Sequence, residues 1–295
     1  MCIEKWQKTV FDLIVNTSTA IPPDVTKALK DAAGREDPDA NAASMLGKMQ
    51  NNIALANDKV APVCQDTGTL LFWVHAPPGV PQYPVRRAIR RAITQATEEG
   101  YLRRNCIDPV SGKNAEDNVG PGNPVIEWVE RPDADICNIA LIMKGGGSEN
   151  VSVQYSLPEK SLGAERNFEG VRRCVLDAVW QAQGKGCAPG VLSVVVGGDR
   201  ATGYKESKRL FLRKLGTANE DPLLQNMEMR IYQDANRLGI GPMGLGGKTT
   251  VLDVFAESLH RVPASYFVTI GYMCWAFRRR SISVSSEGEL YGYEI

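Results

Sequence analysis

Three cysteines lie in sequence settings where a thiolate could hold a metal. Cys64 stands in PVCQDTG (62–68), Cys187 stands in GCAPG (186–190), and Cys274 ends a β-prone run. Turns rich in proline and glycine can point a side chain into a cleft and leave backbone amides free to hydrogen-bond a sulfide. Three unrelated buried thiols would fit the same residues, so both interpretations stay open at this point.

The other cysteines lack such settings. Cys137 alternates within a predicted strand and Cys174 lies on a predicted helix, where a cysteine ordinarily packs as a small hydrophobe. Cys2 and Cys106 have no distinctive surroundings. The total of 7 cysteines is odd and contains no C-x-x-C pair, which indicates a reducing compartment rather than a disulfide framework. We therefore expect a cytoplasmic protein.

The charge balance limits the classes of partner. Basic and acidic side chains number 34 each, so no excess of positive charge favours nucleic acid. No apolar run approaches the ~20 residues that a membrane span needs, and the N-terminus carries polar residues where a signal peptide would be apolar. We expect neither a nucleic-acid partner nor a membrane partner.

Hydrophobic periodicity predicts an α/β fold, with mixed β-sheets flanked by helices and a helical N-terminal segment over about residues 1–60. Residues 1–295 are expected to form a single domain. Predicted strands alternate with helices beyond residue 69. The strands are expected at 70–74, 125–129, 136–143, 191–196 and 266–273, and the helices at 84–99, 172–183, 206–215 and 223–238. The polar tail from Ser281 is expected to be an edge strand or a loose segment.

Two glycine motifs raise the alternative of a nucleotide-binding domain. GIGPMG (239–244) matches G-x-G-x-x-G, but a predicted helix precedes it where a dinucleotide site needs a strand. GKT (247–249) suggests a phosphate loop, but Pro242 occupies the position that needs glycine. We interpret this segment as a loop that serves another ligand, such as an anion.

Five strings occur in an order that resembles a known family. They are CQDTGT (64–69), KGGGSEN (144–150), GCAPG (186–190), GIGPMGLGGKTT (239–250) and CWAFRR (274–279). Together they resemble the N-terminal domain or α subunit of the class I fumarases and tartrate dehydratases, which are iron–sulfur hydro-lyases. The resemblance implies a 4Fe–4S cluster held by Cys64, Cys187 and Cys274. Three thiolates leave one iron open, which can act as a Lewis acid in hydration.

The resemblance also implies a set of substrate-binding residues. Gln65 and Asp66 follow the first ligand and match pocket residues near the open iron. Arg103 matches an arginine that pairs with a substrate carboxylate, with Arg104 as the adjacent alternative. Gly147 matches a backbone contact from the triple-glycine loop. Taken without the family, the sequence favours Asp66 as an N-cap or turn former and Arg103 as a surface ion-pair residue.

The chain departs from the family in two respects. Val262 occupies the position of an active-site histidine; His260 lies two residues earlier and would share its face if the segment were a strand. The C-terminal domain of single-chain relatives is missing, which implies a separate β subunit and a dimer of α–β pairs. Fumarate/malate is the first expected C4 dicarboxylate substrate, followed by L-tartrate and mesaconate. A non-catalytic iron–sulfur scaffold is the alternative that Val262 motivates.

Overall fold

The computed structural model describes residues 3–294, so Cys2 lies outside the described residues. Contacts divide the chain into two compact units. Pro23–Asn51 and Gly147–Trp275 form the second unit, and the rest of the described chain forms the first. Each unit therefore joins segments that are far apart in the sequence. The prediction of a single domain stays a prediction.

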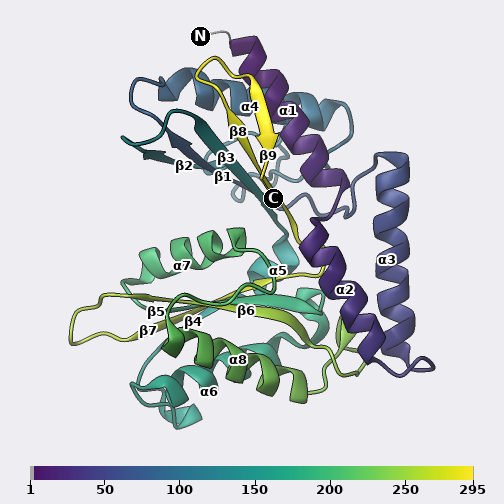
Figure 1. Ribbon diagram of the computed structural model, residues 1–295, viewed down its shortest axis with the longest axis vertical. Helices are drawn as coiled ribbons and strands as arrows, with labels where there is room; N and C mark the ends of the chain where they lie inside the picture. Colours follow the sequence, from purple (N-terminus) through teal and green to yellow (C-terminus); the bar gives the residue numbers. More distant parts are fainter. Residues whose placement is uncertain (1–2, 295) are drawn as a thin grey trace. The chain divides into compact units, whose positions relative to one another are not determined.

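The helices and strands are labelled in Figure 1. The α-helices are α1 (Ile3–Thr19), α2 (Pro23–Arg35), α3 (Asn41–Lys59), α4 (Gln82–Glu98), α5 (Gly146–Asn150), α6 (Phe168–Ala182), α7 (Arg200–Arg209) and α8 (Pro222–Arg237). The short 3-10 helices are η1 (Lys160–Leu162), η2 (Gln183–Gly186), η3 (Leu210–Leu212) and η4 (Pro242–Gly244). The strands are β1 (Thr69–Ala76), β2 (Val125–Glu130), β3 (Cys137–Lys144), β4 (Val153–Ser156), β5 (Gly190–Gly197), β6 (Val251–Leu259), β7 (Phe267–Met273), β8 (Arg278–Val284) and β9 (Leu290–Tyr293).

The first unit contains a mixed sheet in the order β2-β1-β3-β8-β9. Strand β1 runs parallel to β2 and antiparallel to β3. Helix α1 buries Trp6, Val10 and Leu13 completely, and this spacing places them on one face of the helix. They form one core with buried side chains of α4, β1, β3 and β8. The CQDTGT loop leads directly into β1 of this sheet.

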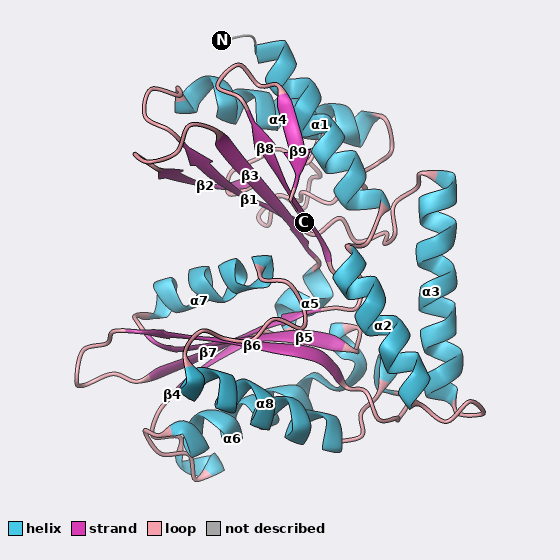
Figure 2. Ribbon diagram, viewed as in Figure 1, coloured by secondary structure: helices cyan, strands magenta, loops and turns pink. Residues whose placement is uncertain are grey.

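The second unit contains a mixed sheet in the order β4-β7-β5-β6. Strand β5 is buried along its whole length, as expected of an inner strand covered on both faces. Helix α7 lies on one face of this sheet, and α6 and α8 lie on the other (Figure 2). The expected α/β class with mixed sheets, flanking helices and a helical N-terminal segment is confirmed.

Some element predictions were wrong in detail. The helix expected at 206–215 begins at Arg200, because Asp199 accepts the N–H groups of Ala201 and Thr202 and so caps it earlier. It is followed by η3 rather than by further α-helix. Ser281 lies within β8, an inner strand between β3 and β9, so the expected edge or loose segment is confined to β9 and its connection. Strands β4, β6 and β8 were not predicted.

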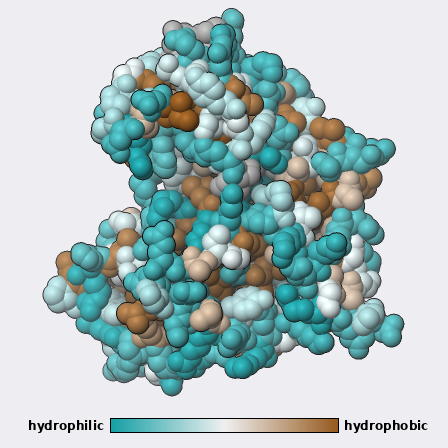
Figure 3. All heavy atoms as spheres, viewed as in Figure 1, coloured by the Kyte–Doolittle hydropathy of each residue, from teal (hydrophilic) through white to brown (hydrophobic). Residues whose placement is uncertain are grey.

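The surface is mainly polar on the face that Figure 3 draws, where hydrophobic residues form separate patches. Across residues 3–294, none of the helices is both long and apolar enough to cross a membrane.

Candidate active site

Cys64 lies half-buried on the loop that joins α3 to β1 in the first unit. The residue before it is held from two sides. Val63 donates its N–H to the carbonyl oxygen of Ser18 at 3.0 Å, and the Asn52 side chain donates to the carbonyl oxygen of Val63 at 2.9 Å. The first predicted ligand therefore stands on a loop that is anchored to α1 and α3.

Gly68, on the same loop, passes very close to the end of β3. It has a positive φ of 72°, and a Cβ added there would lie 2.2 Å from the carbonyl oxygen of Lys144. Only glycine fits both the backbone conformation and the space. The loop is consequently packed against the point at which β3 leads into the triple-glycine segment.

Asp66 joins three of the motifs within the first unit. Its Oδ2 accepts the N–H of Gly146 at 2.7 Å, and its carbonyl oxygen accepts a hydrogen bond from Nη2 of Arg278 at 2.6 Å. Arg278 is only 1% exposed. Asp66 thus contacts Gly146 and Arg278, one residue from each of two other motifs, and its carboxylate is fixed by a backbone amide.

The two candidate arginines differ in their partners. Arg103 is held to the CQDTGT loop through its backbone, because its N–H donates to Oγ1 of Thr67 at 2.8 Å. Its side chain is exposed. Arg104 instead forms an ion pair with Glu116 at 2.5 Å. The side chain of Gln65 is exposed. The role of Arg103 toward a substrate carboxylate stays a prediction.

Cys187 and Cys274 lie next to each other in the second unit. The N–H of Trp275 donates to the carbonyl oxygen of Cys187 at 3.2 Å, so the residue after Cys274 is bonded directly to Cys187. Cys187 has a left-handed backbone with φ of 57°. That conformation is uncommon outside glycine and is concentrated at functional sites. Cys274 is 9% exposed and follows the end of β7.

Tyr272 packs against the turn that carries Cys187. A Cβ added at Gly186 or Gly190 would lie 2.6 Å or 2.4 Å from its ring, so both glycines are required by this close approach. Burial raises the pKa of Tyr272, and nearby Cys274 and Cys187 raise it further. The phenol and the two cysteines therefore share one buried environment.

Gly147 lies beside the same turn. A Cβ at this glycine would be 3.5 Å from the carbonyl oxygen of Lys185, two residues before Cys187. In the second unit the triple-glycine loop and the GCAPG motif are thus neighbours. The structure does not test the predicted role of Gly147 toward substrate.

The predicted ligand set is divided between the units, since Cys64 belongs to the first and Cys187 and Cys274 belong to the second. Within residues 3–294, no group of three or more His, Cys, Asp or Glu side chains is placed to hold a metal ion. The three-cysteine ligand set therefore stays a prediction, of which the structure brings together two members.

The remaining described cysteines differ from this set. Cys137 and Cys174 are fully buried, and burial raises the pKa of Cys137 to about 11 and that of Cys174 to about 12. Their places within the two hydrophobic cores confirm their interpretation as small core residues. Cys106 is half-buried.

The segment that replaces the family histidine is a loop. Strand β6 ends at Leu259, so His260 and Val262 both lie beyond it. His260 is exposed, and Val262 is 65% exposed. Because this segment is not a strand, His260 and position 262 do not share a strand face.

The glycine-rich loop at 239–250 already holds an anion from the chain itself. Both carboxylate oxygens of Glu36 accept the N–H of Lys248, at 2.8 and 3.0 Å, and Oε1 also accepts the N–H of Thr249 at 2.9 Å. Glu36 is 6% exposed. The backbone amides of this loop therefore bind a carboxylate of the chain itself, as part of the fold. This removes the motivation for the nucleotide-binding alternative.

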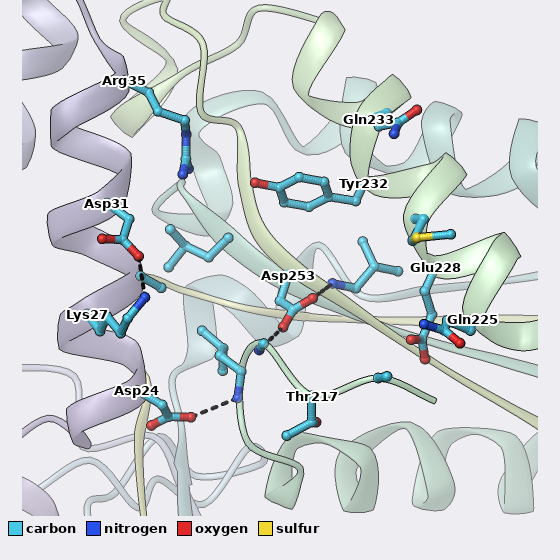
Figure 4. Close-up of a pocket in the computed structure, with 17 residues that line it drawn as sticks. Asp24, Lys27, Asp31, Arg35, Thr217, Gln225, Glu228, Tyr232, Gln233 and Asp253 are labelled. Atoms are coloured by element: carbon cyan, nitrogen blue, oxygen red, sulfur yellow. Dashed lines mark hydrogen bonds and ion pairs between the residues drawn. The ribbon is translucent and has the colours of Figure 1, made fainter. Parts of the chain in front are cut away.

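A cavity of about 520 Å³ in the second unit lies among α2, α8 and β6 (Figure 4). Two of the carboxylates that line it accept backbone N–H groups. Asp253 accepts N–H groups from Gly216 at 2.7 Å and from Val254 at 2.8 Å, and Asp24 accepts the N–H of Leu215 at 2.8 Å. None of the predicted site residues lines this cavity, and Asp24 and Asp253 fix the loop at 215–216.

Three residues with a clear part in these arrangements were not predicted: Glu36, Arg278 and Tyr272. Arg278 and Tyr272 were visible within or beside the CWAFRR motif, but a charged residue in a strand and a phenol in a buried run do not reveal what they contact. Glu36 has no local signal, because its partners are distant in the sequence.

Comparison with known proteins places the chain in one enzyme family. Residues 7–283 match the family described as fumarate hydratase (Fumerase). A putative class I fumarate hydratase of Geobacillus stearothermophilus is 42% identical over 292 residues, which cover 98% of this chain and 57% of the relative.

Two further relatives are tartrate dehydratase subunits. A putative L(+)-tartrate dehydratase subunit alpha of Methanocaldococcus jannaschii is 33% identical over 97% of this chain and 100% of the relative. The L(+)-tartrate dehydratase subunit alpha of Escherichia coli strain K12 is 31% identical over 97% and 92%. The chain belongs to the fumarate hydratase family, which confirms the predicted membership of a family of hydro-lyases.

Proposed function

We propose that this chain is the cluster-bearing part of a hydro-lyase that adds water to, or removes it from, a C4 dicarboxylate. Fumarate and malate form the first substrate pair. The observation that carries the proposal is the hydrogen bond from Trp275 N–H to Cys187 O, at 3.2 Å. It joins two predicted ligand motifs that are far apart in the sequence of a chain belonging to this family.

Cys64, Cys187 and Cys274 are the proposed ligands of a 4Fe–4S cluster. Cysteine thiolates are the usual ligands of such clusters, and a set of three leaves one iron with an open position. Cys64 stands on an anchored loop, Cys187 lies on a turn shaped by glycines, and Cys274 follows β7 beside that turn. When bound, the cluster supplies a Lewis acid for the carboxylate and the hydroxyl group of the substrate.

Asp66 and Gln65 are the proposed substrate contacts on the Cys64 loop. One oxygen of Asp66 is fixed by the Gly146 amide at 2.7 Å, which leaves Oδ1 able to accept a hydrogen bond or a proton from the substrate. A carboxylate that is held by backbone does not need to reorganise during the reaction. Gln65 is exposed and can add an amide contact.

Arg103 is the proposed partner of a substrate carboxylate. Its backbone is fixed to Thr67 of the same loop, and its planar guanidinium can pair with a carboxylate through two parallel hydrogen bonds. Gly147, next to the turn of Cys187, is proposed to contact the substrate through its backbone, since a glycine permits close approach.

The proposal includes a second polypeptide. The chain spans 57% of the length of the fumarate hydratase relative but 100% and 92% of two relatives named as α subunits. We therefore infer a β-type partner that supplies the remaining proton-transfer and carboxylate-binding groups, and a dimer of such α–β pairs as the assembly.

Two alternatives have specific support. Dehydration of L-tartrate is supported by the relatives whose names carry that activity, and mesaconate hydration would use the same groups. A non-catalytic iron–sulfur scaffold is supported by the exposed Val262, which stands where a histidine was expected. The substrate pocket that separates these choices depends on groups outside this chain.

Coexpression with a β-type partner tests the proposal directly. The oxygen-free complex is assayed with fumarate, L-tartrate and mesaconate in parallel, beside the Asp66→Asn variant. We expect oxygen-sensitive turnover of at least one acid that is lost in the variant. A complex that contains its full iron and sulfide but converts none of the three acids would favour the scaffold.

A further inference from the structure

The hydroxyl group of Tyr272 is a buried donor without an acceptor in the described part of the chain. Tyr272 is 2% exposed, and its Oη has no hydrogen-bond partner within residues 3–294. Buried phenol groups usually find a partner, because an unmade hydrogen bond in the interior costs the full desolvation of the group. An acceptor for this O–H group is therefore expected in the functional protein.

The surroundings of Oη identify where that acceptor would be. Oη lies 2.6 Å from the position that a Cβ at Gly190 would occupy, and the ring approaches Gly186 equally closely. These glycines lie on either side of Cys187, so the turn that carries Cys187 packs closely around the phenol ring. Cys274 follows Tyr272 by two residues, and its neighbour Trp275 is bonded to Cys187. The donor thus lies against the turn that carries Cys187, on a residue two positions before Cys274.

A second tyrosine of the same sheet shows the ordinary arrangement. Tyr155 on β4 donates its hydroxyl hydrogen to Oδ2 of Asp177 at 2.7 Å. Tyr155 and Tyr272 both lie in the sheet of the second unit. Of these two tyrosines, it is Tyr272 that packs against the turn carrying a predicted cluster ligand. The missing acceptor for Tyr272 is therefore not common to both of these tyrosines.

We propose that the Tyr272 O–H group donates a hydrogen bond to a sulfur atom of the cluster held by Cys187 and Cys274. This inference rests on the proposed function. Tyr272 is then a positioning residue, since it acts through the cluster and not on the substrate. Hydrogen bonds to cluster sulfurs stabilise the reduced, more negative state and so raise the reduction potential.

The test compares three forms of the full chain, each loaded with iron and sulfide without oxygen: wild type, Tyr272→Phe and Tyr155→Phe. Iron and sulfide contents are measured first, followed by a redox titration monitored by electron paramagnetic resonance. At a fixed potential, Tyr272→Phe is expected to lower the ratio of reduced to oxidised cluster about threefold to tenfold. Tyr155→Phe is expected to match wild type in this ratio while lowering the melting temperature.

Each result has a defined meaning. A fully loaded Tyr272→Phe chain with the wild-type ratio overturns the inference and leaves the proposed function intact. Wild-type chain that takes up neither iron nor sulfide overturns the proposed function and the inference together. If Tyr272→Phe does not fold, wild-type protein carrying ring-deuterated tyrosine replaces it: a deuteron coupling to the electron spin of the reduced cluster supports the inference, and no coupling overturns it.

Discussion

The replacement of Gly68 by alanine tests how the loop that carries Cys64 is held. Gly68 has a φ of 72°, and its added Cβ would lie 2.2 Å from the Lys144 carbonyl oxygen and 2.7 Å from the Gly145 nitrogen. The left-handed conformation costs alanine about 1–2 kcal/mol. Overpacking against atoms that cannot rotate away adds about 1–3 kcal/mol. We expect Gly68→Ala to lower the free energy of unfolding by about 2–5 kcal/mol in all.

Gly79→Ala is the matched control from the same unit. Gly79 also has a positive φ, of 88°, but nothing lies within 4 Å of an added Cβ. It therefore carries only the conformational cost, about 1–2 kcal/mol. The difference between the two variants isolates the close approach to Lys144.

Urea denaturation of the full chain measures both variants. Activity of the complex with a β-type partner gives a second readout, because Asp66 lies two residues before Gly68 and shares its loop. We expect Gly68→Ala to lose activity at temperatures where it is still folded, and Gly79→Ala to keep it. Equal losses of stability in the two variants, with activity retained in both, would refute the packing argument.

Three further predictions concern single side chains. Asp66→Asn is expected to lower kcat about 10²- to 10⁴-fold while the iron content stays unchanged; loss of iron instead would place Asp66 in cluster binding. Arg103→Lys should raise KM for the dicarboxylate, whereas Arg104→Lys should change it little because the ion pair of Arg104 is exposed; the reverse pattern would reassign the carboxylate partner. Glu36→Gln is expected to cost about 1–3 kcal/mol in urea denaturation, since the amide NH2 group cannot accept the N–H of Lys248 as Oε2 does; unchanged stability would show that this bond contributes nothing net.

Local pattern was sufficient for much of the fold. Hydrophobic periodicity predicted the helical N-terminal segment, and the β-prone run at 70–74 predicted β1, because burial on one or both faces leaves a direct mark on the sequence. Strand β8 left no such mark. It begins with Arg278 and Arg279, which are 1% and 0% exposed, and charged residues conceal a buried strand from any hydrophobicity argument.

The candidate site was predictable only in part. The motifs indicated Cys64, Cys187 and Cys274 individually, and the structure brings Cys187 and Cys274 together through a backbone hydrogen bond. The occupant of the glycine-rich loop could not be predicted, because Glu36 is brought to it only by folding. The same holds for Tyr272, whose importance lies in an unsatisfied hydroxyl group that no sequence pattern records.

Iron and acid-labile sulfide in oxygen-free preparations of the full chain test the central claim most directly. Wild type should contain about four of each per chain, and Cys64→Ser, Cys187→Ser and Cys274→Ser should each lose the cluster, whereas Cys106→Ser should retain it. Wild type without iron or sulfide, or a Cys187→Ser variant as fully loaded as wild type, would contradict the account.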